Sequence, residues 1–294
     1  MSFIFENIVK PIVRVTSHVI PDKPYLELKY KWAFKKPLDL KNPVTYNEKL
    51  QWLKLYDRDP LYTKLVDKYE VKKYVAEKIG EEYIIPTYGV WTDAESIDIK
   101  SLPDQFVLKG THDGGSVYLC KDKKSFDIDD AKKKMAYALK KNYYWHGREW
   151  PYKDVQPRII AEAYMEDEET EELRDYKFFC FDGVVKALFI ASDRQKPVDT
   201  KFDFFDADGN HLDIKQGHPN AEIPPKLPVN FELMKELASA LSRGFPQLRV
   251  DFYEVNGKVY FGELTFSHFD GMVPFIPAKW DEDFGSYIQL PNIK

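Results

Sequence analysis

Two carboxylates near the end of the chain could hold a divalent metal ion together with phosphate groups. Asp251 and Glu263 lie in two segments rich in β-branched and aromatic residues, and these segments flank Asn256-Gly257, a strong hairpin signal. Oxygen ligands are those that Mg²⁺ prefers, and in nucleotide sites one or two carboxylates hold it together with phosphates. The pair therefore predicts a magnesium site, provided that both side chains share one face of the hairpin.

The length of the turn decides whether they share it. A two-residue loop would pair Asp251 with Gly262 and turn Glu263 to the opposite face. A three-residue loop over residues 256–258 pairs Asp251 with Glu263. Its other pairs are apolar, Tyr253 with Phe261 and Val255 with Val259. We predict the three-residue loop; the alternative places one carboxylate in an ion pair and the other in solvent.

Arg249 and Thr265 extend this set, because each lies two residues from a carboxylate on its own strand and therefore on the same face. A guanidinium, two carboxylates and a hydroxyl suit magnesium-assisted phosphoryl transfer. The arginine would neutralise phosphate charge that the metal does not.

A second candidate for phosphate binding lies in the middle of the chain. Lys109 ends an apolar run, and a glycine-bearing loop follows it: Thr111, His112, Asp113, Gly114, Gly115 and Ser116. Backbone N–H groups of such a loop can converge on phosphate while the ammonium group neutralises its charge. The pattern is not a P-loop, which needs Gly-Lys-Ser/Thr at the start of a helix. A surface hairpin with a solvated lysine is the alternative.

Composition limits the classes of protein that these motifs could serve. The chain has 294 residues, with 43 Lys and Arg against 48 Asp and Glu, and its net charge of −5 argues against broad binding of nucleic acid. This length suits about two domains. No apolar run reaches the ~20 residues of a membrane-spanning helix. Cys120 and Cys180 allow neither a disulfide framework nor a metal-ligand spacing, so we expect a cytoplasmic enzyme.

The N-terminal segment has two interpretations. Apolar residues recur at helical spacing over residues 1–20, and Lys10 and Arg14 interrupt them, unlike in a signal peptide. We favour a helix docked on the rest of the protein. In the alternative, residues 1–36 contact the inner face of the membrane peripherally, and the basic cluster Lys29, Lys31, Lys35 and Lys36 suits anionic lipid.

The elements that must position these groups are helices and short strands. A capping-box pattern from Thr45 to Glu48 predicts a helix to about residue 58, and a second helix is expected from Pro60 to Gly80. Further helices are predicted over residues 128–141 and 230–243. Strands are predicted over residues 84–86, 106–109, 116–120, 158–162, 176–181 and 184–190. The last two form a predicted hairpin, because Asp182-Gly183 between them is a strong two-residue turn signal. The order favours an α+β fold in which hairpins outnumber βαβ units.

With these pieces in place, residues 42–291 resemble the ATP-grasp superfamily, and most closely its teichuronopeptide-biosynthesis-like (TupA-like) branch. The motifs that carry the resemblance are Asn42-Pro43, Asn47-Glu48-Lys49-Leu50-Gln51-Trp52, Asp67-Lys68, Val107-Leu108-Lys109, Thr111-His112-Asp113-Gly114-Gly115, Glu162-Ala163-Tyr164, Asp175-Tyr176-Lys177-Phe178-Phe179, Arg249-Val250-Asp251 and Gly262-Glu263-Leu264-Thr265-Phe266. Their order and spacing, taken together, are specific.

The resemblance implies an ATP-grasp fold, in which two α+β lobes grip ATP. The expected segments are a helical N-terminal extension (1–60), the N-terminal lobe of the core (61–105), a small lobe with a glycine-rich flap (106–165) and a large lobe with the metal site (166–294). Lys68 and Lys109 would contact the ATP phosphates beneath the flap. The hinge that reads adenine through backbone groups would comprise Glu162, Ala163, Tyr164 and Met165, followed by an acid that reaches the ribose.

The resemblance assigns the C-terminal hairpin to magnesium and to the transferred phosphate. Asp251 and Glu263 would be the metal ligands, and Arg249 would hold the phosphate. Thr265 stands where many ATP-grasp ligases have an asparagine ligand, so the third metal ligand stays open.

The reaction implied by the family joins a carboxylate to an amine. The carboxylate attacks the γ-phosphate of ATP to give an acyl-phosphate and ADP, and an amine then displaces phosphate to form an amide. The branch is associated with capsular or cell-surface polysaccharide assembly. The expected substrates are therefore an amine or amino acid and a uronic acid or other glycan carboxylate, which could be polymeric or linked to a lipid or nucleotide. No nucleic-acid partner is expected.

Three further residues are candidates for substrate contact. Lys177 lies in one of the family motifs. Arg148 belongs to an aromatic and basic cluster over residues 143–150 that suits a sugar acid, although core packing would account for most of it. His268 follows the metal strand, where an acceptor loop would lie, and a turn with a hydrogen-bonded histidine is the alternative.

Two other classes of function compete with this one. Asp206-Ala207-Asp208 offers the Asp-x-Asp metal motif of nucleotide-sugar glycosyltransferases, but Asp208-Gly209-Asn210 is also an ordinary turn signal. A non-catalytic binding module is disfavoured, because lysines, an arginine and metal-type carboxylates all occur together. Release of phosphate from ATP would separate the ligase from both.

Overall fold

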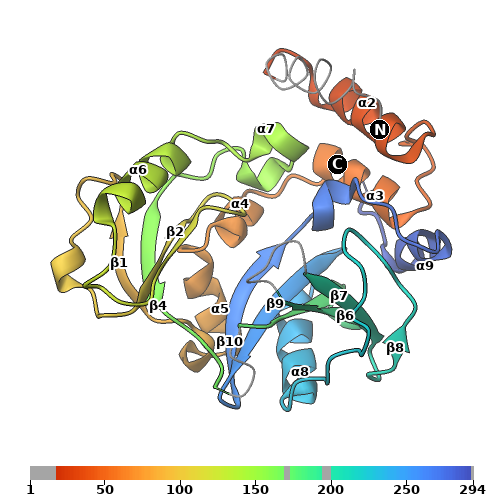
Figure 1. The fold of residues 1–294 in the computed structure, drawn as a ribbon. Coiled ribbons are helices and arrows are strands. Elements are labelled where there is room, and N and C mark those ends of the chain that lie inside the picture. The colour runs from red at the N-terminus through yellow and green to blue at the C-terminus, as the bar shows by residue number, and fades with distance from the viewer. Residues whose placement is uncertain (1–17, 169–172, 194–199, 293–294) are drawn as a thin grey trace.

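The fold consists of two lobes, each built on an antiparallel sheet (Figure 1). The computed structural model describes residues 18–168, 173–193 and 200–292. Every pairing between the described strands is antiparallel. The expected α+β class, with hairpins in place of βαβ units, is confirmed.

The small lobe is a sheet covered on one face by a helix. Its strands are β1 (Thr87–Trp91), β2 (Phe106–Gly110), β3 (Val117–Cys120) and β4 (Ile159–Ala163), in the order β1-β4-β2-β3. Helix α6 (Ile128–Leu139) buries Ala131 and Met135 in one core cluster with Phe106 and Leu108 of β2. Lys109 alternates with these β2 residues, so its side chain lies on the uncovered face of the sheet.

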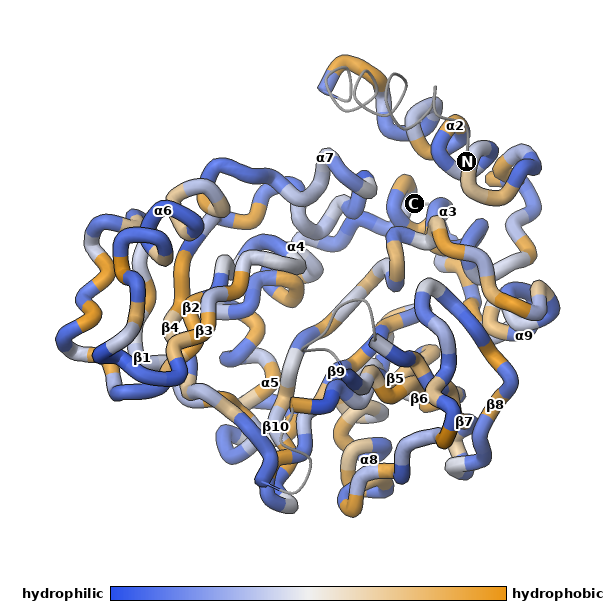
Figure 2. Tube along the Cα trace, viewed as in Figure 1, coloured by the Kyte–Doolittle hydropathy of each residue, from blue (hydrophilic) through white to orange (hydrophobic). Residues whose placement is uncertain are grey.

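The large lobe is a sheet buried on both faces. Its strands are β5 (Asp175–Phe181), β6 (Val184–Ser192), β7 (Lys201–Asp206), β8 (His211–Leu212), β9 (Leu248–Val255) and β10 (Lys258–Thr265), in the order β10-β9-β5-β6-β7-β8. Phe178 and Cys180 of β5 join the core beneath helix α8 (Phe231–Ser242). Phe179 and Phe181 alternate with them and pack with residues of α3 (Tyr46–Tyr56) and α9 (Lys279–Tyr287) on the other face. Hydrophobic segments accordingly concentrate in the strands and beneath these helices (Figure 2).

Helix α3 begins as the sequence predicts, but the following helix does not continue as expected. The Thr45 hydroxyl accepts the Glu48 N–H, and the Glu48 carboxylate accepts the Thr45 N–H, which completes the capping box. The single helix expected from Pro60 to Gly80 is instead two helices, α4 (Pro60–Val66) and α5 (Val71–Ile79). The Asp67 carboxylate accepts the N–H groups of residues 69 and 70, which stabilises a turn between them.

The strand predicted over residues 84–86 is also wrong. These residues follow a 3-10 turn, η2 (Glu81–Tyr83), and β1 begins only at Thr87. Pro86 has no N–H to donate to a strand partner, although its carbonyl accepts the Ala163 N–H at 3.0 Å. The chain therefore joins the sheet after the proline.

Several elements had no clear sequence signal. They are α2 (Asp22–Phe34), α7 (Tyr144–Gly147), the 3-10 turns η3 (Ile99–Ser101), η4 (Trp150–Tyr152) and η5 (His268–Gly271), and helix α9. Most of the helix expected over residues 1–20 lies outside the described residues. None of the described helices is long and apolar enough to cross a membrane.

Candidate functional site

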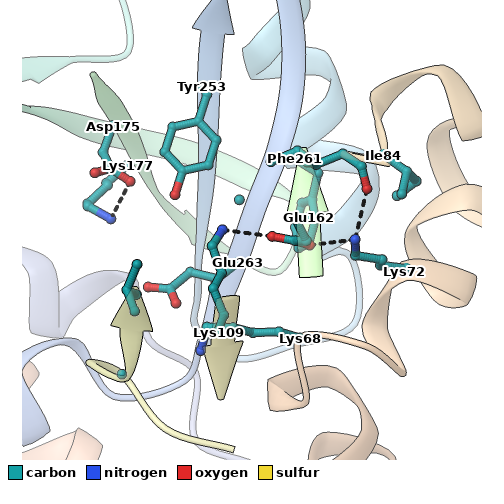
Figure 3. Close-up of a pocket in the computed structure, with 14 residues that line it drawn as sticks. Lys68, Lys72, Ile84, Lys109, Glu162, Asp175, Lys177, Tyr253, Phe261 and Glu263 are labelled. Carbon is teal, nitrogen blue, oxygen red and sulfur yellow. Dashed lines mark hydrogen bonds and ion pairs between the residues drawn. The ribbon is translucent and has the colours of Figure 1, made fainter. Parts of the chain in front are cut away.

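A small pocket of ≈120 Å³ lies between the uncovered face of the small-lobe sheet and the large lobe (Figure 3). Six predicted site residues line it: Lys68, Lys109, Gly114, Glu162, Lys177 and Glu263. Three polar lining residues were not among the predicted site residues: Lys72, Asp175 and Tyr253. Lys72 follows Lys68 by four residues, a spacing that could have suggested it, although in the structure Lys68 lies in the turn before α5 and Lys72 within α5. The pocket brings residues from five separate segments together.

The C-terminal hairpin pairs Asp251 with Glu263, but by a different register from the predicted one. Val255 pairs with Lys258, so the turn is the two-residue Asn256-Gly257, with φ of 51° and 73°. Both values are left-handed, as a type I′ turn requires. The predicted three-residue loop is therefore wrong.

A β-bulge at Gly262 restores the pairing of the two carboxylates. The register shifts between Phe261 and Glu263, so Glu263 lies opposite Asp251 and Thr265 opposite Arg249. A side chain at Gly262 would begin 3.1 Å from the Asp251 carbonyl oxygen, which explains why glycine suits the bulge. Bulges of this kind redirect side chains beside functional sites.

Arg249 and Asp251 form the buried centre of this site. Nε and Nη2 of Arg249 donate to the two oxygens of Asp251 at 2.7 Å each, and Nη2 also donates to Glu263 Oε1 at 3.0 Å. Lys177 of β5 reaches the same aspartate and also Asp175, at 3.1 Å from its Oδ1. Asp251 is fully buried, so its negative charge is balanced by these two cations.

Glu263 is the more accessible of the two carboxylates. Its side chain is 34% exposed and lines the pocket. Burial acts to raise the pKa of Glu263, but Lys177, Lys68 and Arg249 outweigh it and lower the pKa to about 2. The side chain is therefore ionised at neutral pH and presents negative charge to the pocket.

These groups fit a magnesium ion held jointly with phosphates. Glu263 offers an accessible carboxylate, and the Thr265 hydroxyl lies 3.5 Å from its Oε1. Both oxygens of Asp251 already accept N–H groups and its side chain is fully buried, so Glu263 is the carboxylate of this pair that faces the pocket. Among the residues that the structure describes, no three His, Cys, Asp or Glu side chains form a metal-binding group. A hard cation here would thus need oxygens from a ligand to complete its shell.

Glu162 holds two lysines on the small-lobe side of the pocket. Its carboxylate accepts Lys72 Nζ at 2.5 Å and Lys109 Nζ at 2.7 Å, as Figure 3 shows. Burial acts to raise the pKa of Glu162, but Lys109 and Lys72 prevail and lower it. The backbone of Glu162 pairs within the sheet, and the Ala163 N–H is bonded to Pro86. Of the expected hinge, only Tyr164 and Met165 lie beyond β4.

The predicted flap is a loop whose own aspartate satisfies its N–H groups. The Asp113 carboxylate accepts the Gly115 and Ser116 N–H groups at 3.3 and 3.0 Å and the Ser116 hydroxyl at 2.5 Å. Lys68 Nζ donates to the Asp113 carbonyl. Thr111 and His112 are buried and anchor the loop, with His112 Nε2 2.9 Å from the carbonyl oxygen of Ala138 in α6. Only the two glycines of the loop are exposed or pocket-lining.

A family model confirms the resemblance over most of the chain. The model of the TupA-like ATP-grasp family matches residues 48–289. The chain belongs to the TupA-like ATP-grasp family. No curated protein matches it.

Solved ATP-grasp ligases show a more distant likeness. The L-amino acid ligase from Bacillus licheniformis is 12% identical, with 84% of this chain and 55% of that chain covered, at a TM-score of 0.44. The D-alanine–D-alanine ligase from Bacillus anthracis is 17% identical, with 69% and 57% covered, at 0.39. The D-cycloserine synthetase DcsG is 17% identical, with 70% and 64% covered, at 0.39. This TupA-like chain therefore spans less than two thirds of each, and the family assignment rests on the family match.

The predicted substrate residues of this TupA-like chain have different surroundings. Arg148 is buried at the junction with α2, with its Nε 3.2 Å from Asp22 Oδ1 and its guanidinium 4.2 Å from the centre of the Tyr25 ring. It is not among the pocket residues. Its contacts are those of a residue that holds the N-terminal helix in place.

His268 acts on the site through Arg249. Arg249 Nη1 donates to His268 Nδ1 at 2.7 Å, so Nε2 carries the proton and donates to Gln216 Oε1 at 3.1 Å. Burial and the positive charge of Arg249 lower the pKa of His268, so the ring is neutral. His268 is thus a buried orienting group for the arginine.

The motif that suggested a glycosyltransferase forms a turn. The Asp206 carboxylate accepts the N–H groups of Asp208 and Asn210 at 2.9 and 2.8 Å, between β7 and β8. These contacts support the interpretation of Asp206-Ala207-Asp208 as part of a turn. The motif contributes no lining residue to the pocket.

Proposed function

We propose that this protein is an ATP-dependent ligase that joins a carboxylate to an amine through an acyl-phosphate. The observation that carries the proposal is the convergence, around one pocket, of Lys68, Lys72 and Lys109 from one side and the Arg249–Asp251–Glu263 network from the other. Positive charge on both sides of an ionised carboxylate suits a metal-bound triphosphate. Phosphoryl transfer depends mainly on such positioning and neutralisation.

In this proposal the lysines bind the phosphates of ATP. Lys68 and Lys109 both line the pocket; Lys68 also donates to the Asp113 carbonyl of the flap, and Glu162 fixes Lys109 in place through its ion pair at 2.7 Å. The adenine would contact the backbone of Tyr164 and Met165, because the preceding residues of β4 already pair within the sheet. The pocket volume, ≈120 Å³, is below the ~300–1,000 Å³ of typical small-molecule sites, so in this proposal the flap opens to admit a nucleotide.

The hairpin of β9 and β10 would serve the transferred phosphate. Glu263, Asp251 and Thr265 would hold Mg²⁺, which supplies charge neutralisation for the phosphates. Arg249 stays fully charged at any relevant pH and points one Nη toward Glu263. His268 holds its other Nη, so the guanidinium plane is fixed beside the reacting phosphate.

The reaction is balanced as two displacements. A carboxylate oxygen of the substrate forms a bond to the γ-phosphorus as the bond to the β–γ bridging oxygen breaks, and ADP leaves. The amine nitrogen then attacks the acyl carbon, loses a proton, and the carbon–oxygen bond to phosphate breaks. The flap excludes water in between, since hydrolysis would return the carboxylate.

For the carboxylate we propose a uronic acid or another acid of a cell-surface glycan, as the TupA-like branch implies. For residues 1–36 we propose peripheral membrane contact at the cytoplasmic face. Lys29 and Lys36 form ion pairs with Asp270 and Glu48, whereas Lys31 and Lys35 are exposed and form no ion pair with the described residues. Flotation with anionic vesicles, comparing full-length protein with a variant that lacks residues 1–20, tests this contact.

Release of ADP measured over a panel of uronic acids tests the ligase proposal, with hydroxylamine in place of the unknown amine. We expect hydroxamate to form only when ATP, Mg²⁺ and an accepted acid are all present. Transfer of sugar from a nucleotide-sugar without ATP would contradict the proposal in favour of a glycosyltransferase.

A further inference from the structure

A second hollow lies on the outer side of the small lobe, next to the flap. This groove has a volume of ≈670 Å³ and runs between helix α6 and the segment from Gly115 to Val117. Val117 lines both this groove and the pocket between the lobes. The groove and the pocket therefore meet at Val117, directly after the flap.

The groove is basic in a chain that is acidic as a whole. Four lysines line it (Lys133, Lys134, Lys140 and Lys141), against one acid, Asp130. Asp130 is neutralised, because it pairs with Lys134 at 2.8 Å and accepts the Tyr118 hydroxyl at 2.8 Å. Lys133, Lys140 and Lys141 are exposed, and no ion pair is found for them within the described part of the chain. Their charge is available to an anionic ligand.

An exposed aromatic ring lies among these lysines. Tyr137 is 61% exposed, and the Lys141 ammonium lies 4.4 Å from the centre of its ring. Lys133 and Tyr137 lie one helical turn apart on α6, and Lys141, two residues beyond the end of the helix, reaches back to the Tyr137 ring. A flat ring with a polar hydroxyl can cover the apolar face of a sugar while the flanking ammonium groups meet its carboxylates.

We propose that this groove binds an anionic, carboxylate-bearing sugar chain and directs its end toward the flap. The proposal rests on the proposed function, because a ligase of this kind needs a carboxylate at the flap. A groove that contains a single ring and separated ammonium groups fits a narrow chain with spaced charges. A membrane surface would instead need a broad convex patch.

The test compares binding of oligogalacturonate, galacturonate monomer and neutral dextran to the full-length protein by calorimetry, without ATP. The groove variant is Lys133→Glu/Lys140→Glu/Lys141→Glu. The matched control, Lys64→Glu/Lys73→Glu/Lys78→Glu, reverses three exposed lysines of α4 and α5 that do not line the groove. An oligodeoxythymidylate and anionic vesicles serve as the other polyanions.

We expect the wild type and the control to bind oligogalacturonate, and the groove variant to bind it at least about tenfold more weakly. Galacturonate monomer should bind alike to all three proteins. The same affinity in the groove variant and the wild type would overturn the proposal, as would tighter binding of oligonucleotide or vesicles than of oligogalacturonate. Hydroxamate formation from small acids is measured separately. Absence of hydroxamate would contradict the ligase proposal, whereas unchanged oligogalacturonate binding by the groove variant would contradict the groove proposal.

Discussion

Neutralising each of the two carboxylates of the C-terminal hairpin is expected to affect the protein differently, one changing its stability and the other mainly its activity. Asp251 is fully buried and bonded to both Arg249 and Lys177. Asp251→Asn therefore removes the buried anion that two cations share and leaves each with one carboxylate partner, which costs roughly 3–5 kcal/mol. At roughly 2–4 °C per kcal/mol for a protein of this size class, the melting temperature should fall by about 6–20 °C.

Glu263→Gln should leave the fold nearly intact. The Glu263 side chain is 34% exposed, and Arg249, which donates to it, keeps both bonds to Asp251. A partly exposed ion pair contributes about 1 kcal/mol at most, so the melting temperature should fall by no more than about 4 °C. The rate should nevertheless fall by about 10²–10³, because one preorganised electrostatic contact to the transferred phosphate is lost.

Thermal melts and hydroxamate formation, measured on the same preparations, check both variants. Asp251→Asn should lose activity and stability together, whereas Glu263→Gln should lose activity alone. A Glu263→Gln variant as active as the wild type would refute the metal assignment. A Glu263→Gln variant that melts as early as Asp251→Asn would refute the distinction between the two carboxylates.

Three further predictions follow from other contacts. Lys109→Ala should weaken binding of Mg·ATP by roughly 10–150-fold, which corresponds to the loss of one charged hydrogen bond. Calorimetric titration measures the affinity, and an unchanged value would show that Lys109 does not bind ATP. His268→Ala should lower kcat with little change in the KM for ATP, because His268 orients Arg249 without reaching the pocket; a change confined to KM would argue against that role. Burial, followed by the charge of Asp270, raises the pKa of Glu149 well above 4.5, so the folded state keeps a proton that the unfolded state releases. The free energy of unfolding should therefore fall as the pH rises above about 4.5, and Glu149→Gln should gain stability over the wild type between pH 5 and pH 8 in urea melts, whereas parallel pH profiles would contradict this.

The sequence was sufficient to predict the elements whose signals are local. The capping box at Thr45 and Glu48 and the turn at Asp182-Gly183, with φ of 44° and 79°, form as expected. Each depends on neighbours a few residues away, so periodicity and turn chemistry were enough to identify them.

The pairing of Asp251 with Glu263 was predicted correctly for the wrong reason. Matching of apolar partners favoured a longer loop, whereas the chain uses the two-residue turn and then a bulge at Gly262. A bulge changes the register within the strand, and the turn sequence does not indicate where it occurs. The glycine beside Glu263 was the available signal, because it tolerates the close approach of the Asp251 carbonyl.

Contacts between distant segments could not be predicted in the same way. The ion pair of Lys72 with Glu162 joins residues 90 positions apart, and Lys177 reaches Asp251 across 74. The first pair depends on how helix α5 meets strand β4 and the second on the pairing of β5 with β9, which neither spacing nor composition determines. For the same reason the sequence suggested Arg148 for substrate, although its contacts lie with Asp22 and Tyr25.

The most direct test of the acyl-phosphate follows oxygen from the substrate into phosphate. An accepted uronic acid is labelled with ¹⁸O in its carboxylate and incubated with the protein, Mg·ATP and hydroxylamine, and the released phosphate is analysed by mass spectrometry. The account predicts one ¹⁸O atom in each phosphate formed, because the attacking carboxylate oxygen leaves with the phosphoryl group. Phosphate that carries no ¹⁸O while hydroxamate accumulates would contradict the account.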